Sequence, residues 1–136
     1  MKNIVVGIDF SESSMNAMRH AVAISLKTKA VLHLAWVKTP GVASGVNENS
    51  DNNDFLKKAN EKLQEWVKLC KQESPESEIN SVVLEGKVHV AITNYAANLS
   101  DCIIVMGTHG TSGFEEGYIG NNVYRLINMA TVPVLI

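Results

Sequence analysis

The sequence predicts a doubly wound α/β domain with a mostly parallel five-stranded sheet and four helices. Short apolar segments alternate with segments whose apolar residues recur at helical spacing, and each connection is long enough for a right-handed crossover. The first apolar segment is continuous rather than alternating, which is typical of a strand covered on both faces. A length of 136 residues with 46% hydrophobic residues fits a single domain spanning 1–136.

Each element follows from a local pattern. Ser11 stands where a helix N-cap is expected, with Glu12 in the first turn. Pro40 ends the second strand, and Pro75 follows the second helix. Pro133 cannot donate a ladder hydrogen bond, so we expect the last strand at a sheet edge. The expected strands are 3–8, 30–37, 79–85, 102–106 and 131–136, and the expected helices cover about 12–28, 56–74, 88–99 and 123–130.

One long connection interrupts this alternation. From about 40 to 54 the composition shifts to Gly, Ser, Asn, Asp and Glu, with little apolar content. A loop of this length in a compact domain is usually a lid, a binding loop or a disordered segment. We therefore expect a flexible surface loop at about 40–54.

Charge and composition exclude several classes of protein. The formal net charge of −2 provides no basic footprint for nucleic acid or for an anionic membrane surface. No apolar run approaches the roughly 18 residues that span a bilayer, and the N-terminus leads directly into a strand pattern. Cys70 and Cys102 form neither a CxxC pair nor a disulfide framework. We expect a cytoplasmic protein with a small-molecule partner, and neither nucleic acid nor a membrane as partner.

A glycine-rich turn is the strongest candidate for a binding site. Five glycines lie between Gly107 and Gly120, after an apolar strand and before an amphipathic helix. Glycine permits close backbone approach and a helix N-terminus attracts anions, so the pattern favours a phosphate site. The alternative is a tight chain reversal without a ligand. If strands one and four flank the point where strand order reverses, Asp9 and Gly107 open onto the same crevice, where Asp9 either orients a ligand or only caps the turn.

Three motifs carry a resemblance to a known family. They are Ile4-Val5-Val6-Gly7-Ile8-Asp9 followed by Ser11, Val105-Met106-Gly107-Thr108-His109-Gly110, and Val132-Pro133-Val134-Leu135. With these motifs the chain resembles a universal stress protein domain from residue 3 to residue 136. Nucleotide-binding members carry glycine, two residues, glycine, nine residues, glycine, then Ser or Thr. Gly107, Gly110 and Gly120 keep this spacing, and Asn121 occupies the Ser/Thr position.

The resemblance implies an adenine nucleotide alpha hydrolase-like fold and a stress-response role in binding or sensing adenine nucleotides, without an established reaction. It implies ATP with Mg²⁺ as the ligand. It also implies a homodimer paired through the C-terminal strand, or a tandem second domain that takes the place of the partner. The residues that it assigns to the nucleotide are Asp9 for the ribose or the metal, Val37 for the adenine edge, and Gly107, Gly110, Gly120 and Asn121 for the phosphates.

Other residues keep alternatives open. Thr111 replaces a basic residue found in many relatives, and Glu115 and Glu116 add negative charge to the turn, so a dimeric interaction module without nucleotide affinity is the second hypothesis. A small hydrolase with weak ATPase activity is the third. The chain has no G-x-x-x-x-G-K-[ST], G-x-G-x-x-G or G-x-S-x-G motif, and we identify no catalytic residue. His109 is a lone histidine, and a lone histidine is more often a hydrogen-bonded structural residue than a catalyst. The histidines have no spacing with cysteines or carboxylates that predicts a metal site made by protein ligands alone.

Overall fold

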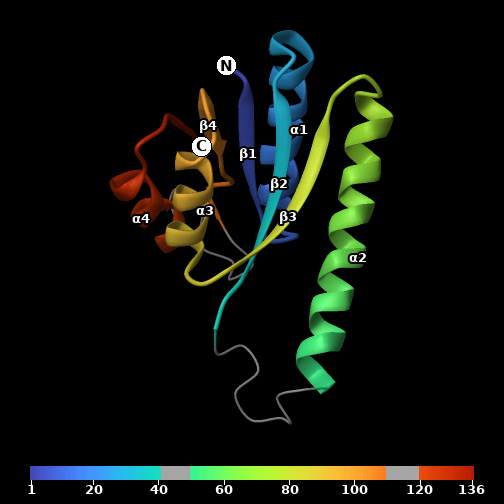
Figure 1. The fold of residues 1–136 in the computed structure, drawn as a ribbon, viewed down its shortest axis with the longest axis vertical. Coiled ribbons are helices and arrows are strands. Elements are labelled where there is room, and N and C mark those ends of the chain that lie inside the picture. Colours follow the sequence, from blue (N-terminus) through green and yellow to red (C-terminus); the bar gives the residue numbers. More distant parts are fainter. Residues whose placement is uncertain (41–49, 110–119) are drawn as a thin grey trace.

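The computed structural model describes residues 1–40, 50–109 and 120–136, with the backbone alone for 50–53. These residues form a parallel five-stranded sheet of order β3-β2-β1-β4-β5 with four helices, which confirms the predicted fold class (Figure 1). The elements are β1 (Asn3–Ile8), α1 (Glu12–Thr28), β2 (Val31–Lys38), α2 (Ser50–Glu73), β3 (Ile79–Glu85), α3 (Val88–Ala97), β4 (Cys102–Val105), α4 (Asn121–Met129) and β5 (Val134–Leu135).

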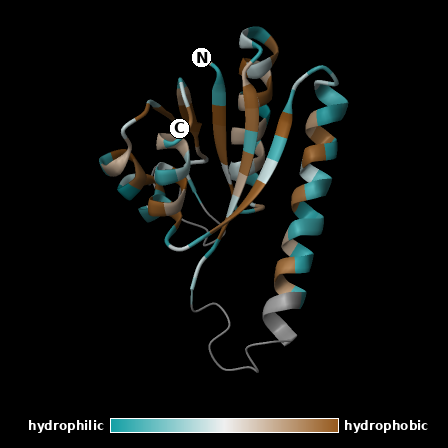
Figure 2. Ribbon diagram, in the orientation of Figure 1, coloured by the Kyte–Doolittle hydropathy of each residue, from teal (hydrophilic) through white to brown (hydrophobic). Residues whose placement is uncertain are grey.

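Helices cover both faces of the sheet. The helices α1 and α2 pack on one face, and α3 and α4 pack on the other (Figure 1). In β1, Ile4 and Val6 enter the core under α1 and α2, whereas Val5 between them enters the core under α3 and α4. Apolar colour therefore predominates along β1 and β2, although hydrophilic bands interrupt it (Figure 2). Burial on both faces explains why these strands read as continuous apolar runs.

The last strand lies at the sheet edge, as Pro133 predicts. β5 pairs only with β4, and the Pro133 carbonyl accepts a hydrogen bond of 2.9 Å from the Ile104 N–H. The strand is shorter than the expected 131–136, because only Val134–Leu135 join the ladder. A proline with no N–H and a single neighbouring strand limit the ladder to this short segment.

The second helix begins earlier than the sequence indicates. α2 starts at Ser50, so residues 50–54 are helical rather than part of the flexible loop expected at about 40–54. Asp and Asn are common in loops, so their presence here suggests a loop. Acidic residues are also favourable in the first turn of a helix, where they face the positive end of the helix dipole. The rest of the expected loop, 41–49, lies outside the described residues. None of the described helices is both long and apolar enough to cross a membrane.

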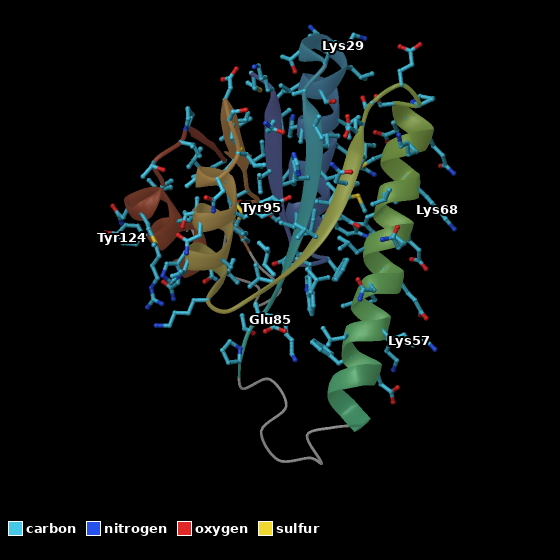
Figure 3. The ribbon with its side chains drawn as sticks, in the orientation of Figure 1. Lys29, Lys57, Lys68, Glu85, Tyr95 and Tyr124 are labelled. Atoms are coloured by element: carbon cyan, nitrogen blue, oxygen red, sulfur yellow. The ribbon has the colours of Figure 1, made fainter. Side chains whose placement is uncertain are left out.

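The predicted cap of the first helix is confirmed. Ser11 is the N-cap of α1, and its hydroxyl accepts a hydrogen bond of 3.2 Å from the Ser14 N–H. The helix ends at Thr28, and the C-cap residue Lys29, which is labelled in Figure 3, has a left-handed backbone with φ of 63°. Because α1 begins directly after β1, its first turn lies at the carboxyl end of the sheet.

A buried polar network ties β2 to α3 near the amino end of the sheet. His33 is 6% exposed, and its two ring nitrogens lie 3.0 Å from the Tyr95 hydroxyl and 2.9 Å from Asn3 Oδ1. Because Asn3 Nδ2 donates to the Ser100 carbonyl, Asn3 Oδ1 is the acceptor that faces His33. Nε2 of His33 therefore carries the proton, and Nδ1 accepts from Tyr95.

We expect His33 to make the protein less stable in acid. Burial lowers the pKa of His33 below 6.5, and Glu78 only partly opposes this shift. Below pH 6.5 the unfolded chain therefore binds more protons at this residue than the folded chain, so stability is lost as pH falls from 6.5 towards the lowered pKa. Urea unfolding between about pH 5 and 8 measures this slope. His33→Gln should flatten it, whereas substitution of the exposed His20 by Gln should not. Equal slopes in all three proteins would contradict the assignment.

Candidate functional site

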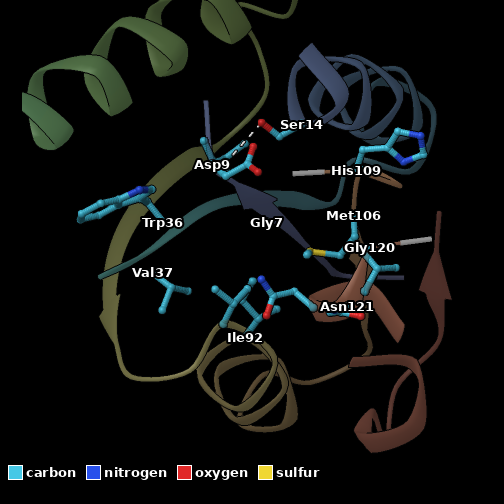
Figure 4. Close-up of a pocket in the computed structure, with 15 residues that line it drawn as sticks. Gly7, Asp9, Ser14, Trp36, Val37, Ile92, Met106, His109, Gly120 and Asn121 are labelled. Atoms are coloured by element: carbon cyan, nitrogen blue, oxygen red, sulfur yellow. Dashed lines mark hydrogen bonds between the residues drawn. The ribbon is translucent and has the colours of Figure 1, made fainter. Parts of the chain in front are cut away.

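A cavity opens at the carboxyl ends of β1 and β4, where the strand order reverses. From β1 the chain leaves to the face of α1, and from β4 it leaves to the face of α4, so no crossover covers the gap between them. The cavity, called here the β1–β4 pocket, has a volume of about 310 Å³ (Figure 4). It is lined by Gly7, Ile8, Asp9, Ser14, Trp36, Val37, Val88, Ile92, Met106, Gly107, His109, Gly120, Asn121, Asn122 and Val123.

Asp9 stands at the end of β1 with one carboxylate oxygen already in use. Its Oδ1 accepts hydrogen bonds from the Ser11 N–H, at 2.9 Å, and from the Ser11 hydroxyl. The Asp9 N–H lies 3.4 Å from the Ser14 hydroxyl, which also holds the turn. Asp9 therefore shapes the entry into α1, and no hydrogen bond within the described residues engages its Oδ2. The same side chain can cap the turn and present one oxygen to a ligand.

Aromatic rings support the wall next to Asp9. Phe10 has a left-handed backbone with φ of 64°, which is uncommon for a bulky residue. Its ring centroid lies 5.4 Å from that of Trp66 in α2, edge to face, and 6.4 Å from that of Trp36 in β2. The ring centroid of Trp36 in turn lies 5.6 Å from that of Phe55, near the start of α2. These contacts offset the backbone strain at Phe10 and hold Trp36 against the pocket.

Two glycines allow the chain to approach closely around the pocket. A Cβ on Gly107 would lie 2.7 Å from the backbone carbon and oxygen of Ser13, in the first turn of α1. A Cβ on Gly7 would overlap the side chain of Met106. The end of β4 therefore touches α1 through bare backbone, and the His109 N–H donates to the Ser13 hydroxyl at 3.2 Å.

The opposite wall is the start of α4. The Gly120 N–H donates to the Thr108 carbonyl at 2.8 Å, which joins the two described ends of the glycine-rich turn. Gly120 is also the N-cap of α4 and supplies no side-chain cap. Asn121, Asn122 and Val123 follow in the first turn and line the pocket. Within the described residues no side chain caps this helix N-terminus, and an N-terminus at a cavity wall can hold an anionic group.

The structure brings most of the sequence-predicted site residues together. Five of the six line the same cavity, and the sixth, Gly110, lies outside the described residues. Figure 4 shows Asp9 on one side, Val37 near α3, and Asn121 extending towards Ile92. Their contacts with a ligand stay a prediction. The five that share the pocket are Asp9, Val37, Gly107, Gly120 and Asn121.

The sequence patterns do not identify the apolar residues that line the pocket. Trp36 has only the pattern of a strand residue, yet it is 8% exposed and borders the pocket. Ile92 and Val88 have only the pattern of a helical face, and both also line the pocket from α3. Their position near the end of β2 or in the first two turns of α3 is the signal that could indicate them, because these ends lie at the carboxyl edge of the sheet.

One carboxylate and one imidazole are among the described residues that line the pocket. They belong to Asp9 and His109. The His109 imidazole lies beside α1, away from Val37 and Ile92 (Figure 4), and its Nδ1 is buried without a hydrogen-bond partner in the described part of the chain. Within residues 1–40, 50–109 and 120–136 no three His, Cys, Asp or Glu residues cluster as metal ligands. Asp9 is the one carboxylate among the described residues that line the pocket.

The sequence matches the model of the universal stress protein family over residues 1–136. It is similar to universal stress protein MJ0531 of Methanocaldococcus jannaschii, with 29% identity covering 99% of this chain and 81% of the relative.

Solved structures of low sequence identity share the fold. The universal stress protein UspA of Lactobacillus plantarum superposes with a TM-score of 0.84 at 19% identity, covering 98% of this chain and 95% of that one. A universal stress protein solved in complex with cAMP superposes with a TM-score of 0.77 at 21% identity, covering 99% and 95% of the two chains.

We expect Gly107→Ala to destabilise the protein. The new methyl group would overlap the Ser13 backbone, which cannot move without shifting the first turn of α1. Overpacking of this kind costs about 1–3 kcal/mol, measurable by urea unfolding. Ser13→Ala is the matched control, because it removes the hydrogen bond to the His109 N–H but leaves the close packing. If Gly107→Ala proves no less stable than Ser13→Ala, the close approach is not a constraint.

Proposed function

Because this chain belongs to the universal stress protein family, we propose that it binds an adenine nucleotide in the β1–β4 pocket and acts in a stress response as a sensor rather than as an enzyme. We place this activity in the cytoplasm. The observation that carries the proposal is the cavity itself, which lies at the reversal of strand order and is bordered by Asp9, Val37 and the start of α4. A protein of the same fold has been solved with cAMP, which supports an adenine nucleotide as ligand class.

Each wall has a proposed role. The free carboxylate oxygen of Asp9 accepts a hydrogen bond from a ribose hydroxyl. The backbone at Val37 meets the adenine edge, and the side chains of Ile92 and Met106 pack on the base. The phosphate end lies at Gly107, Gly110, Gly120 and Asn121. Nucleotides from AMP to ATP with Mg²⁺ are the candidates, and with ATP the carboxylate of Asp9 would help to hold the metal instead of the ribose.

A second function is favoured by exposed apolar side chains near the last strand. Leu135 and Ile136 are 43% and 44% exposed, and in α4 Ile127 and Met129 are each 43% exposed. The unpaired edge of β5 adds free backbone groups beside them. We propose that this surface pairs two copies of the chain, or pairs this domain with a tandem second domain. A dimeric interaction module that lacks nucleotide affinity would use the same surface.

Nucleotide binding is tested by mass spectrometry of small molecules released from the purified protein and by calorimetric titration with AMP and with Mg-ATP. Asp9→Asn should weaken AMP binding about fivefold to tenfold, because the NH₂ group that replaces Oδ2 cannot accept a hydrogen bond from a ribose hydroxyl. Asp101→Asn is the matched control, since Asp101 precedes β4 at the opposite end of the sheet. Absence of released nucleotide, together with absence of heat at millimolar concentrations, would leave only the interaction module.

Pairing is tested by light scattering coupled to size exclusion. We expect a dimer for the unmodified chain and a monomer for Leu135→Glu, because a carboxylate cannot be buried at an apolar interface without a partner. Leu69→Glu on α2 is the control, since Leu69 is equally exposed at 42% but lies on another surface. Equal masses for both variants would show that the β5 surface is not the dimer interface.

A further inference from the structure

The Trp36 side chain belongs both to the β1–β4 pocket and to the core under α2. Trp36 lies near the end of β2, where its register partner in β1 is Ile8, the residue before Asp9. Its side chain lines the pocket and is also part of the core cluster under α1 and α2. Figure 4 shows its ring at the border of the pocket, on the side where α2 lies. A movement of this ring would therefore change the pocket and the packing of α2 together.

The helix α2 contacts the Trp36 ring through Phe55. The two ring centroids lie 5.6 Å apart, with an angle of 56° between the ring planes, which makes a tilted aromatic pair. Trp36 is 8% exposed, whereas Phe55 is 43% exposed. Phe55 is not among the residues that line the pocket. A change at Phe55 would therefore reach a bound ligand through Trp36.

Few buried side chains hold the start of α2 against the sheet. Figure 1 shows this start extending past the end of β3. Of the side chains described at 54–58, only that of Leu56 is partly buried, and the others are exposed. Helix ends with few buried contacts open locally at a low free-energy cost. The Phe55–Trp36 pair is therefore an important contact for keeping these turns packed.

Other contacts anchor the middle of α2. Lys62 Nζ lies 5.5 Å from the centroid of the Phe10 ring, and the ring centroid of Trp66 lies 5.4 Å from it, edge to face. Leu63 between them is 1% exposed. None of these three α2 side chains lines the pocket. The start of α2, rather than its middle, can therefore respond to the position of Trp36.

We propose that Phe55 is a positioning residue for the β1–β4 pocket, and that nucleotide binding and the packed start of α2 stabilise each other through Trp36. This inference rests on the proposed function and specifies how that site is regulated. The start of α2 has a packed state and a locally opened state. A ligand that packs on Trp36 favours the ring position that Phe55 also favours, so ligand and helix start bind the ring cooperatively. The coupling cannot exceed the value of the aromatic pair, about twofold to tenfold in an equilibrium constant.

Calorimetric titration of the whole chain and its variants with AMP tests this inference. Phe55→Ala should weaken AMP binding about twofold to tenfold, because the Trp36 ring loses its partner. Phe55→Tyr keeps the ring and should bind AMP as the unmodified chain does. Leu69→Ala is the matched control, since Leu69 is 42% exposed on the same helix and does not line the pocket.

The outcomes separate this inference from the proposed function. A merely structural role of Phe55 would change the stability of the fold but not the AMP affinity of the folded protein. Equal AMP affinities of Phe55→Ala and Leu69→Ala would therefore overturn the inference while leaving nucleotide binding intact. If the unmodified chain binds neither AMP nor Mg-ATP, the proposed function itself is wrong, and this inference is overturned with it.

Hydrogen exchange measured by mass spectrometry provides the second test. With saturating AMP, we expect the amides of 54–60 to exchange about twofold to tenfold more slowly, because the ligand disfavours the opened start of α2. The amides of 67–73, at the other end of the same helix, are the internal control and should change less. In Phe55→Ala the slowing at 54–60 should be lost. No slowing at 54–60, or slowing that persists in Phe55→Ala, would overturn the inference.

Discussion

The backbone of Gly107 packs against the first turn of α1, and the geometry of the β1–β4 pocket depends on this contact. Parallel pairing of β1 with β4 brings the two strand ends to the same edge, but a side chain at residue 107 would hold the following turn away from Ser13. Because that side chain is missing, the His109 N–H reaches the Ser13 hydroxyl. The turn after β4, the start of α1 and Asp9 therefore share one wall.

Two helices begin at this pocket, and they differ in their electrostatic state. The start of α1 is satisfied by Ser11, whose own N–H and hydroxyl donate to Asp9. The start of α4 follows Gly120, and no side chain within the described residues caps it. The first helix terminus is therefore already capped within the protein, whereas the second presents its backbone N–H groups at the pocket wall.

Aromatic packing joins the pocket to α2. Phe10 directly follows Asp9 and keeps a left-handed backbone because its ring packs with Trp66 and Trp36. Trp36 is both a pocket wall and a neighbour of Phe55, near the start of α2. The same aromatic rings therefore support both Asp9 at the pocket and the packing of α2 on the sheet. Strain at one residue is offset by contacts that order several elements.

The sequence by itself determined the fold class, the cap at Ser11 and the edge position of the last strand, because continuous apolar runs, N-cap chemistry and a proline without N–H act locally. It also indicated that Asp9 and Gly107 share a crevice, since parallel strand ends meet at one edge. Only the tertiary structure placed Trp36 and Ile92 at the pocket and started α2 at Ser50. These features depend on contacts between elements distant in sequence, and local periodicity carries no information about which face or end of an element a cavity will border.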